Sequence, residues 1–278
     1  MQYIRVTFSF TAIEEYQQDL LINDLAGIGF NTFEDTTTGF DAFIEADQFN
    51  ADSLNAILDD LEEVDFSFEV AEIAAENWNK EWEKNFEPLI IADQCYVRAT
   101  FHPAQPQYPY QIVIDPKMAF GTGHHQTTTM MMEYILDTDV ADKVVLDMGC
   151  GTGILAILAE MKGAGKLVAI DYDDVCFEST VENTALNNCT HIQAICGGKE
   201  VIPDFSFDVI LANINRNILL DQIPVYAQVL KPGGLIFFSG FYEFPDLEMI
   251  KEACEKLGIN YQGHKKNGDW VAAKFKCI

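Results

Sequence analysis

The chain has 278 residues, 49% of them apolar, so it is long enough for one large domain or for a medium domain and a small one. Its 44 Asp and Glu side chains outnumber its 17 Lys and Arg, which gives a formal net charge of −27. This charge argues against a nucleic acid bound through its phosphates, whereas it attracts basic macromolecules.

The sequence shows no sign of membrane insertion, secretion or metal binding. It contains no run of eighteen apolar residues, and its first residues, MQYIRVTFSF, lack a basic start followed by an apolar run. The seven cysteines are odd in number and lack CxxC spacing, and the adjacent His124 and His125 lack the i, i+4 spacing of a helical metal site. We expect a cytoplasmic protein with no membrane partner, no disulfide framework and no metal.

Residues 1–72 are predicted to form a small domain. YIRVTFSF alternates like a strand, EEYQQDLLINDLAGIG has helical spacing, and FNTFEDTTTGFDAFIEAD contains two alternating runs around a turn. A helix in NADSLNAILDDLE and a strand in VDFSFEVAEI complete the order β-α-β-β-α-β of a ferredoxin-like α+β domain. Because this segment holds no catalytic constellation, we expect it to recognise the substrate.

Residues 73–90, which include NWNKEWEKNF, are predicted to form a connecting helix, and residues 91–278 a larger domain. From VVLDMG onward, apolar strands and helices alternate as far as GGLIFFSG. This alternation predicts a mostly parallel sheet with helices on both faces, and the chain ends in a predicted hairpin.

The stretch VVLDMGCGTGILAILA contains a glycine loop of the kind that holds a nucleotide beyond the carboxyl ends of parallel strands. Asp171 ends the next predicted strand, twenty-two residues after Gly149, where a carboxylate can accept both ribose hydroxyls of NAD or of S-adenosylmethionine. Asp147 discriminates between them, since a carboxylate at the mouth of the loop would repel a pyrophosphate and suits a free ammonium group. The loop, with Gly149 and Gly151 allowing close approach, therefore favours S-adenosylmethionine.

Two further motifs give the chain a narrower resemblance. DPKMAFGTGHHQTT, residues 115–128, and LANINRNIL, residues 211–219, resemble two signatures of the PrmA family, the methyltransferases of ribosomal protein L11. The family's small first domain, connecting helix and catalytic domain match the predicted order. The chain departs from the family pattern at Lys117, at Gln126 and at Asn215-Arg216-Asn217, which follows Asn213 in place of a more apolar run.

The resemblance implies a Rossmann-like class I methyltransferase domain with a mostly parallel seven-stranded sheet and a terminal antiparallel hairpin, preceded by the ferredoxin-like domain. It implies S-adenosylmethionine as the cofactor. The loop Phe120-Gly121-Thr122-Gly123, which precedes the predicted helix TTMMMEYIL of residues 128–136, is expected to close over it as a lid that excludes water. The expected cofactor contacts are Thr128, Gly149, Asp171 and Asn213 by resemblance, Asp147 and Gly151 in the loop, and Phe120, Gly121 and Thr122 in the lid.

The implied reaction is transfer of methyl groups to lysine side chains of ribosomal protein L11, with its N-terminal α-amine as a further acceptor. Asn213 follows the predicted strand FDVILAN, where its side-chain oxygen can orient the acceptor amine. Enzymes that methylate planar amides or base amines often carry Asn-Pro-Pro-Tyr at this point, whereas this chain has Asn213-Ile214-Asn215-Arg216. A flat acceptor would lack its stacking platform.

We expect a monomer whose partner is a basic ribosomal protein, with no direct nucleic-acid contact. Three alternatives stay open on the sequence alone. They are methylation of another protein or of an amide, an NAD-linked oxidoreductase on the same type of sheet, and a binding protein that senses the cofactor without catalysis.

Overall fold

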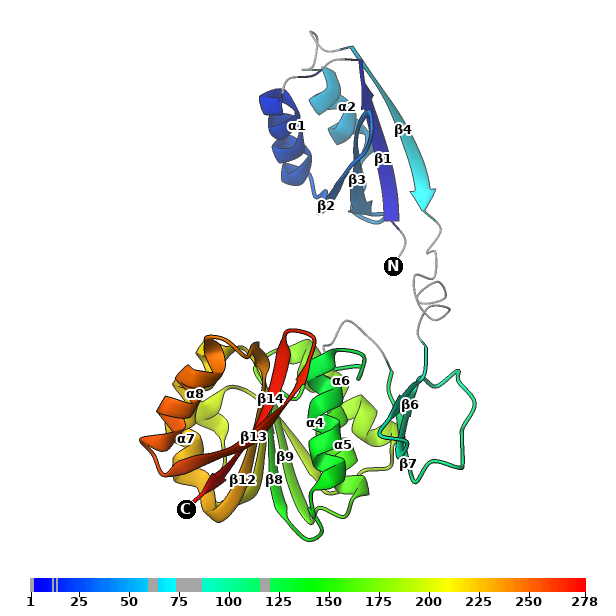
Figure 1. The fold of residues 1–278 in the computed structure, drawn as a ribbon. Helices are drawn as coiled ribbons and strands as arrows, with labels where there is room; N and C mark the ends of the chain where they lie inside the picture. Colours follow the sequence, from blue (N-terminus) through cyan, green and yellow to red (C-terminus); the bar gives the residue numbers. More distant parts are fainter. Residues whose placement is uncertain (1–2, 12, 14, 60–64, 74–86, 116–120) are drawn as a thin grey trace. The chain divides into compact units, whose positions relative to one another are not determined.

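The computed structural model describes residues 3–11, 13, 15–59, 65–73, 87–115 and 121–278 (Figure 1). The chain divides into two compact units, Met1–Asn85 and Phe86–Ile278. Most of the predicted connecting helix, residues 74–86, lies outside the described residues.

The first unit is a four-stranded antiparallel sheet with two helices. Its strand order is β2-β3-β1-β4, and β1 pairs antiparallel with both β3 and β4. Strand β3 alternates between buried and half-buried side chains, because only one face of the sheet is covered. This order confirms the expected ferredoxin-like α+β fold. The elements are β1 (Tyr3–Phe10), α1 (Glu15–Gly27), β2 (Thr32–Asp35), β3 (Gly39–Glu45), α2 (Ala51–Asp59) and β4 (Phe66–Ile73).

The second unit begins with a small sheet of order β5-β6-β7 and continues into a seven-stranded sheet with helices. Its first elements are β5 (Leu89–Ile91), β6 (Cys95–Arg98), β7 (Tyr110–Val113), α4 (Gln126–Asp137), β8 (Val144–Met148), α5 (Ile154–Met161), β9 (Lys166–Asp171) and α6 (Asp174–Leu186). The remaining elements are β10 (Ile192–Cys196), η1 (Lys199–Val201), β11 (Phe207–Asn213), α7 (Arg216–Val229), β12 (Leu230–Tyr242), α8 (Asp246–Glu255), β13 (Ile259–Asn267) and β14 (Trp270–Cys277).

The large sheet has the strand order β10-β9-β8-β11-β12-β14-β13. Strand β8 pairs in parallel with β9 on one side and with β11 on the other, so the chain reverses its direction of winding at β8. Strand β14 runs antiparallel between β12 and β13. The order confirms the expected Rossmann-like sheet with its terminal hairpin, and it places the switch point, where ligands bind, beside β8.

Separate apolar cores fill the two faces of this sheet. Helices α4 and α5 cover one face and helices α7 and α8 the other (Figure 1). Strands β8, β9 and β11 contribute buried side chains to both cores, which is why their sequences are apolar throughout. Within the described part of the chain, no helix is long and apolar enough to cross a membrane.

Candidate active site

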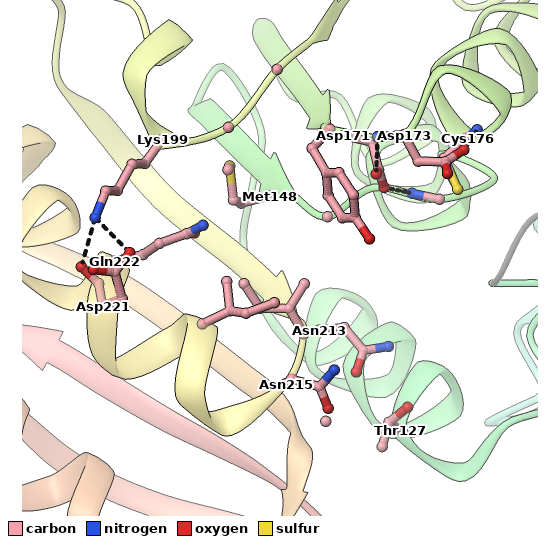
Figure 2. Close-up of a pocket in the computed structure, with 18 of the residues that line it drawn as sticks. Thr127, Met148, Asp171, Asp173, Cys176, Lys199, Asn213, Asn215, Asp221 and Gln222 are labelled. Carbon is pink, nitrogen blue, oxygen red and sulfur yellow. Dashed lines mark hydrogen bonds and ion pairs between the residues drawn. The ribbon is translucent and has the colours of Figure 1, made fainter.

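A cleft of about 620 Å³ opens at the carboxyl ends of the parallel strands (Figure 2). Met148, Asp171 and Asn213, which end β8, β9 and β11, all line it. The other walls come from the glycine loop, the segment between β10 and η1, the start of α7, the start of α4 and Trp270. The volume lies within the range of ordinary ligand pockets, which is about 300–1,000 Å³.

The glycine loop is held in a shape that only glycine adopts easily. Gly149, Gly151 and Gly153 have φ angles of +75°, +56° and +78°. A Cβ atom on Gly149 would lie 2.2 Å from the Cγ2 atom of Ile214, so a side chain there would displace the wall of the cleft. The backbone therefore lies directly against the space that a ligand would fill.

The backbone N–H groups of this loop bond within the protein. Those of Gly149 and Cys150 donate to the carbonyl oxygen of Ile170 at 2.8 and 3.1 Å, and that of Gly153 donates to Cys150 at 2.8 Å. The Gly151 N–H donates to the carboxylate of Asp171 at 2.9 Å. These four donors are thus already used, whereas a pyrophosphate-binding loop presents its N–H groups to the ligand.

Asp171 lies in the cleft wall with its carboxylate fixed by two backbone donors. Its Oδ2 atom accepts from Gly151, and its Oδ1 atom accepts from the N–H of Asp173 at 3.1 Å. Each carboxylate oxygen can accept more than one hydrogen bond, so lone pairs remain for hydroxyl groups in the cleft.

Asn213 presents an unpartnered oxygen beside this wall. Its Nδ2 atom donates to the Oγ1 atom of Thr128 at 3.4 Å, while its Oδ1 atom is buried and has no hydrogen-bond partner among the described residues. Thr128 itself is buried and does not line the cleft; its neighbour Thr127 does. The structure thus places Thr128 behind Asn213, where it orients the amide.

Asp147 does not stand at the mouth of the loop, as we expected, but beneath it. The residue is 1% exposed and is absent from the cleft wall, and its Oδ2 atom accepts from the N–H of Ala156 in α5 at 3.2 Å. Desolvation raises the pKa of this carboxyl to about 7; the hydrogen bond from Ala156 lowers it and the charge of Asp171 raises it. The Asp147 carboxylate therefore does not face the ligand, and it cannot repel a pyrophosphate there as we expected.

The lid residues that the structure describes also lie outside the cleft wall. The carbonyl oxygen of Gly121 accepts from the Thr152 hydroxyl at 2.6 Å, and the Thr122 hydroxyl lies 3.3 Å from His124 Nδ1. This segment is therefore attached to the glycine loop. Phe120, which we expected in the lid, lies outside the described residues.

Two aromatic residues of the wall, His125 and Trp270, are not among the expected cofactor contacts, although His125 lies within the motif of residues 115–128. His125 caps α4, and its Nδ1 atom accepts from the N–H of Thr127 at 3.3 Å. The edge of its ring meets Trp270, with ring centroids 5.0 Å apart. Trp270 reaches the cleft from the antiparallel strand β14, and only the pairing of β14 with β12 brings it there.

The sheet order and the cleft at its switch point define the fold of the class I methyltransferases. A methyltransferase from Pyrococcus furiosus shares this fold at a TM-score of 0.51 and 22% identity, over 60% of this chain and 90% of that one. The chain belongs to the ribosomal protein L11 methyltransferase (PrmA) family, whose model matches residues 11–277. The expected family and enzyme class are confirmed.

Individual relatives agree with this assignment. Ribosomal protein L11 methyltransferases from Phocaeicola vulgatus and Porphyromonas gingivalis are 42% and 43% identical to the chain, over 99% of it and over 99% and 98% of their own lengths. A solved ribosomal protein L11 methylase from Lactobacillus delbrueckii subsp. bulgaricus matches at a TM-score of 0.65 and 30% identity, over 69% of this chain and all of that one.

Proposed function

We propose that this chain transfers methyl groups from S-adenosylmethionine to lysine side chains of ribosomal protein L11, with the N-terminal α-amine as a further acceptor. The observation that carries the proposal is the buried, unpartnered Oδ1 atom of Asn213 at the cleft, because such an acceptor calls for a donor from a ligand. An amine N–H is such a donor.

The chemistry of the cleft fits S-adenosylmethionine, which contains an adenosine and an amino acid but no phosphate. Asp171 can accept the ribose hydroxyls, and the glycine loop lets the ligand lie against the backbone. Among the described residues of the wall, Lys199 is the only Lys or Arg, and its Nζ atom lies 2.5 Å from the carboxylate of Asp221 (Figure 2). A pyrophosphate would need an unpaired cation or unbonded N–H groups. Lys199 is paired with Asp221, and the four loop N–H groups described above already donate within the protein.

The protein's task in the reaction is to align the acceptor amine and to favour its neutral form. When bound, S-adenosylmethionine supplies an electrophilic methyl group on a cationic sulfur. A lysine amine with a pKa near ~10.4 costs about 4–5 kcal/mol to deprotonate at neutral pH. Desolvation in the cleft lowers this cost, and Asn213 Oδ1 accepts one amine N–H so that the nitrogen lone pair is directed along a fixed line.

Residues 1–72 are proposed to grip the ribosomal protein, because their sequence holds no catalytic constellation. The net charge of −27 favours encounter with a basic partner and disfavours direct contact with nucleic acid. We propose a monomer that acts in the cytoplasm, where its substrate is made.

A calorimetric titration with S-adenosylmethionine and with NAD tests the cofactor. We expect binding of the first alone; binding of NAD alone would support an oxidoreductase instead. Incubation of ribosomal protein L11 with the enzyme and a methyl-labelled donor then tests catalysis. Binding of the donor without transfer of label to any protein or amide acceptor would support the cofactor-sensing alternative.

A further inference from the structure

An aromatic wall separates the cleft from a second hollow. Tyr242 and Trp270 are partners in the register of β12 and β14, and their ring centroids lie 4.6 Å apart. Trp270 lines the cleft, whereas Tyr242 lines a hollow of about 350 Å³. The two cavities therefore adjoin through this pair of rings.

The hollow has an exposed apolar side chain beside charged residues. Phe244 lines it and is 83% exposed. The nearby carboxylate of Glu243 is occupied, since it lies 2.5 Å from Lys266 Nζ and 3.2 Å from His264 Nε2. Asp269 adds a second carboxylate to the lining. An exposed aromatic ring in this setting offers a contact for an apolar side chain of a polypeptide, and the two carboxylates favour a basic one.

The turn of residues 242–245 is joined to the segment that follows Asn213 by one buried carboxylate, that of Asp246. The Oδ1 atom of Asp246 lies 2.7 Å from Arg216 Nη1, and its Oδ2 atom accepts from the N–H of Tyr242 at 3.1 Å. Arg216 begins α7, three residues after Asn213. It belongs to the run Asn215-Arg216-Asn217, the departure from the family pattern, and its guanidinium also donates to Asn217 Oδ1 from Nε at 3.0 Å.

We propose that residues 242–245 receive the polypeptide next to the acceptor lysine, with one of its apolar side chains packed on Phe244. Arg216 and Asp246 are positioning residues that hold this turn, and with it the Tyr242–Trp270 wall, in register with Asn213. The proposal rests on the proposed function, because a lysine of a protein that enters the cleft brings its neighbouring residues to the rim. The hollow on the other side of the Tyr242–Trp270 wall is the surface that they meet.

Steady-state kinetics with ribosomal protein L11, together with calorimetry for S-adenosylmethionine, tests the proposal. We expect Phe244→Ala to raise KM about tenfold, as loss of an aromatic anchor does, while kcat and the cofactor Kd change by less than about twofold. Phe101→Ala is the matched control, because Phe101 is also exposed, at 43%, but lines neither cavity. It is expected to leave KM unchanged.

Variants of Arg216 separate positioning from a merely structural role. Arg216→Met should raise KM for ribosomal protein L11 several-fold. Arg216→Lys retains a cation for Asp246, so its KM should stay close to that of the wild type. In the double variant with Phe244→Ala, Arg216→Met should add little, because both act through the same contact.

The outcomes distinguish the two proposals. A wild-type enzyme that leaves ribosomal protein L11 unmethylated overturns the proposed function and this inference with it. A wild-type enzyme that methylates it, combined with a Phe244→Ala variant whose KM matches that of Phe101→Ala, overturns this inference alone. A parallel rise in the cofactor Kd would also overturn it, because the turn would then act on the cofactor.

Discussion

Two carboxylates on neighbouring strands of the sheet have opposite environments. Asp171 faces the cleft and accepts two backbone N–H groups, whereas Asp147 lies beneath the glycine loop with one oxygen unpartnered among the described residues. Only Asp171 can therefore touch a ligand directly. Asp147 acts on the site through the packing of the loop and of α5.

Removal of the Asp171 carboxylate should weaken cofactor binding. Asp171→Ala loses the proposed bonds to the ribose and the anchor of Gly151, which together are worth about 3 kcal/mol, or roughly a hundredfold in Kd. Calorimetry with S-adenosylmethionine measures the change. Asp174→Ala, three residues away and outside the cleft wall, is the matched control, and equal affinities for the two variants would contradict the ribose assignment.

The buried Asp147 predicts a pH-dependent stability. Its pKa is raised to about 7 in the folded protein, so the folded state binds more protons than the unfolded state between the two pKa values. The free energy of unfolding should therefore fall as the pH rises from about 4 to about 7, by up to ~4 kcal/mol for this group.

Urea unfolding of the wild type and of Asp147→Asn over this pH range measures the effect. The neutral variant should lose this part of the pH dependence, whereas the exposed Asp204→Asn should behave like the wild type. Parallel curves for the wild type and Asp147→Asn would show that Asp147 titrates alike in the folded and unfolded states.

At the scale of the elements, the glycine loop joins β8, β9 and β11 at one point. Gly149 bonds to Ile170 of β9, and its Cα atom leaves no room for a Cβ atom beside Ile214, which follows β11. Any side chain on Gly149 must displace the Ile214 side chain, which follows Asn213 and lines the cleft. The loop thus contacts the strands on both sides of β8.

Gly149→Ala should weaken binding of S-adenosylmethionine by more than about tenfold and destabilise the protein by more than the ~1–2 kcal/mol of a left-handed alanine. Gly233→Ala is the matched control, since Gly233 has a φ of +77° but nothing within 4 Å of an added Cβ atom. Calorimetry and urea unfolding of both variants separate the steric effect from backbone strain. Equal losses in the two would contradict the role of the Ile214 contact.

The order of these elements could be predicted from sequence, because alternating and continuous apolar runs report directly which faces are buried. The sequence also predicted that Gly149, Gly151, Asp171 and Asn213 meet at one edge of the sheet, since parallel strands end there. The direction of the Asp147 side chain could not be predicted, because a residue near a strand end can face either the ligand or the next helix, here α5. Trp270 was also missed, because its place depends on the register between β12 and β14, which no local pattern reports.

At the scale of the whole molecule, charge should govern the encounter with the protein substrate. A chain with a net charge of −27 attracts a basic partner over a distance that salt shortens. We expect KM for ribosomal protein L11 to rise between low and physiological ionic strength while kcat stays constant. The cofactor Kd under the same salts is the control, and a KM independent of salt would contradict electrostatic steering.

The Asn213 end of the cleft is proposed to deliver methyl groups to protein amines. Peptide mapping by mass spectrometry of ribosomal protein L11, after incubation with the enzyme and S-adenosylmethionine, tests it most directly. We expect methyl increments on lysine side chains, with the N-terminal α-amine as the further acceptor. Increments confined to amide side chains, or none in the presence of bound cofactor, would contradict it.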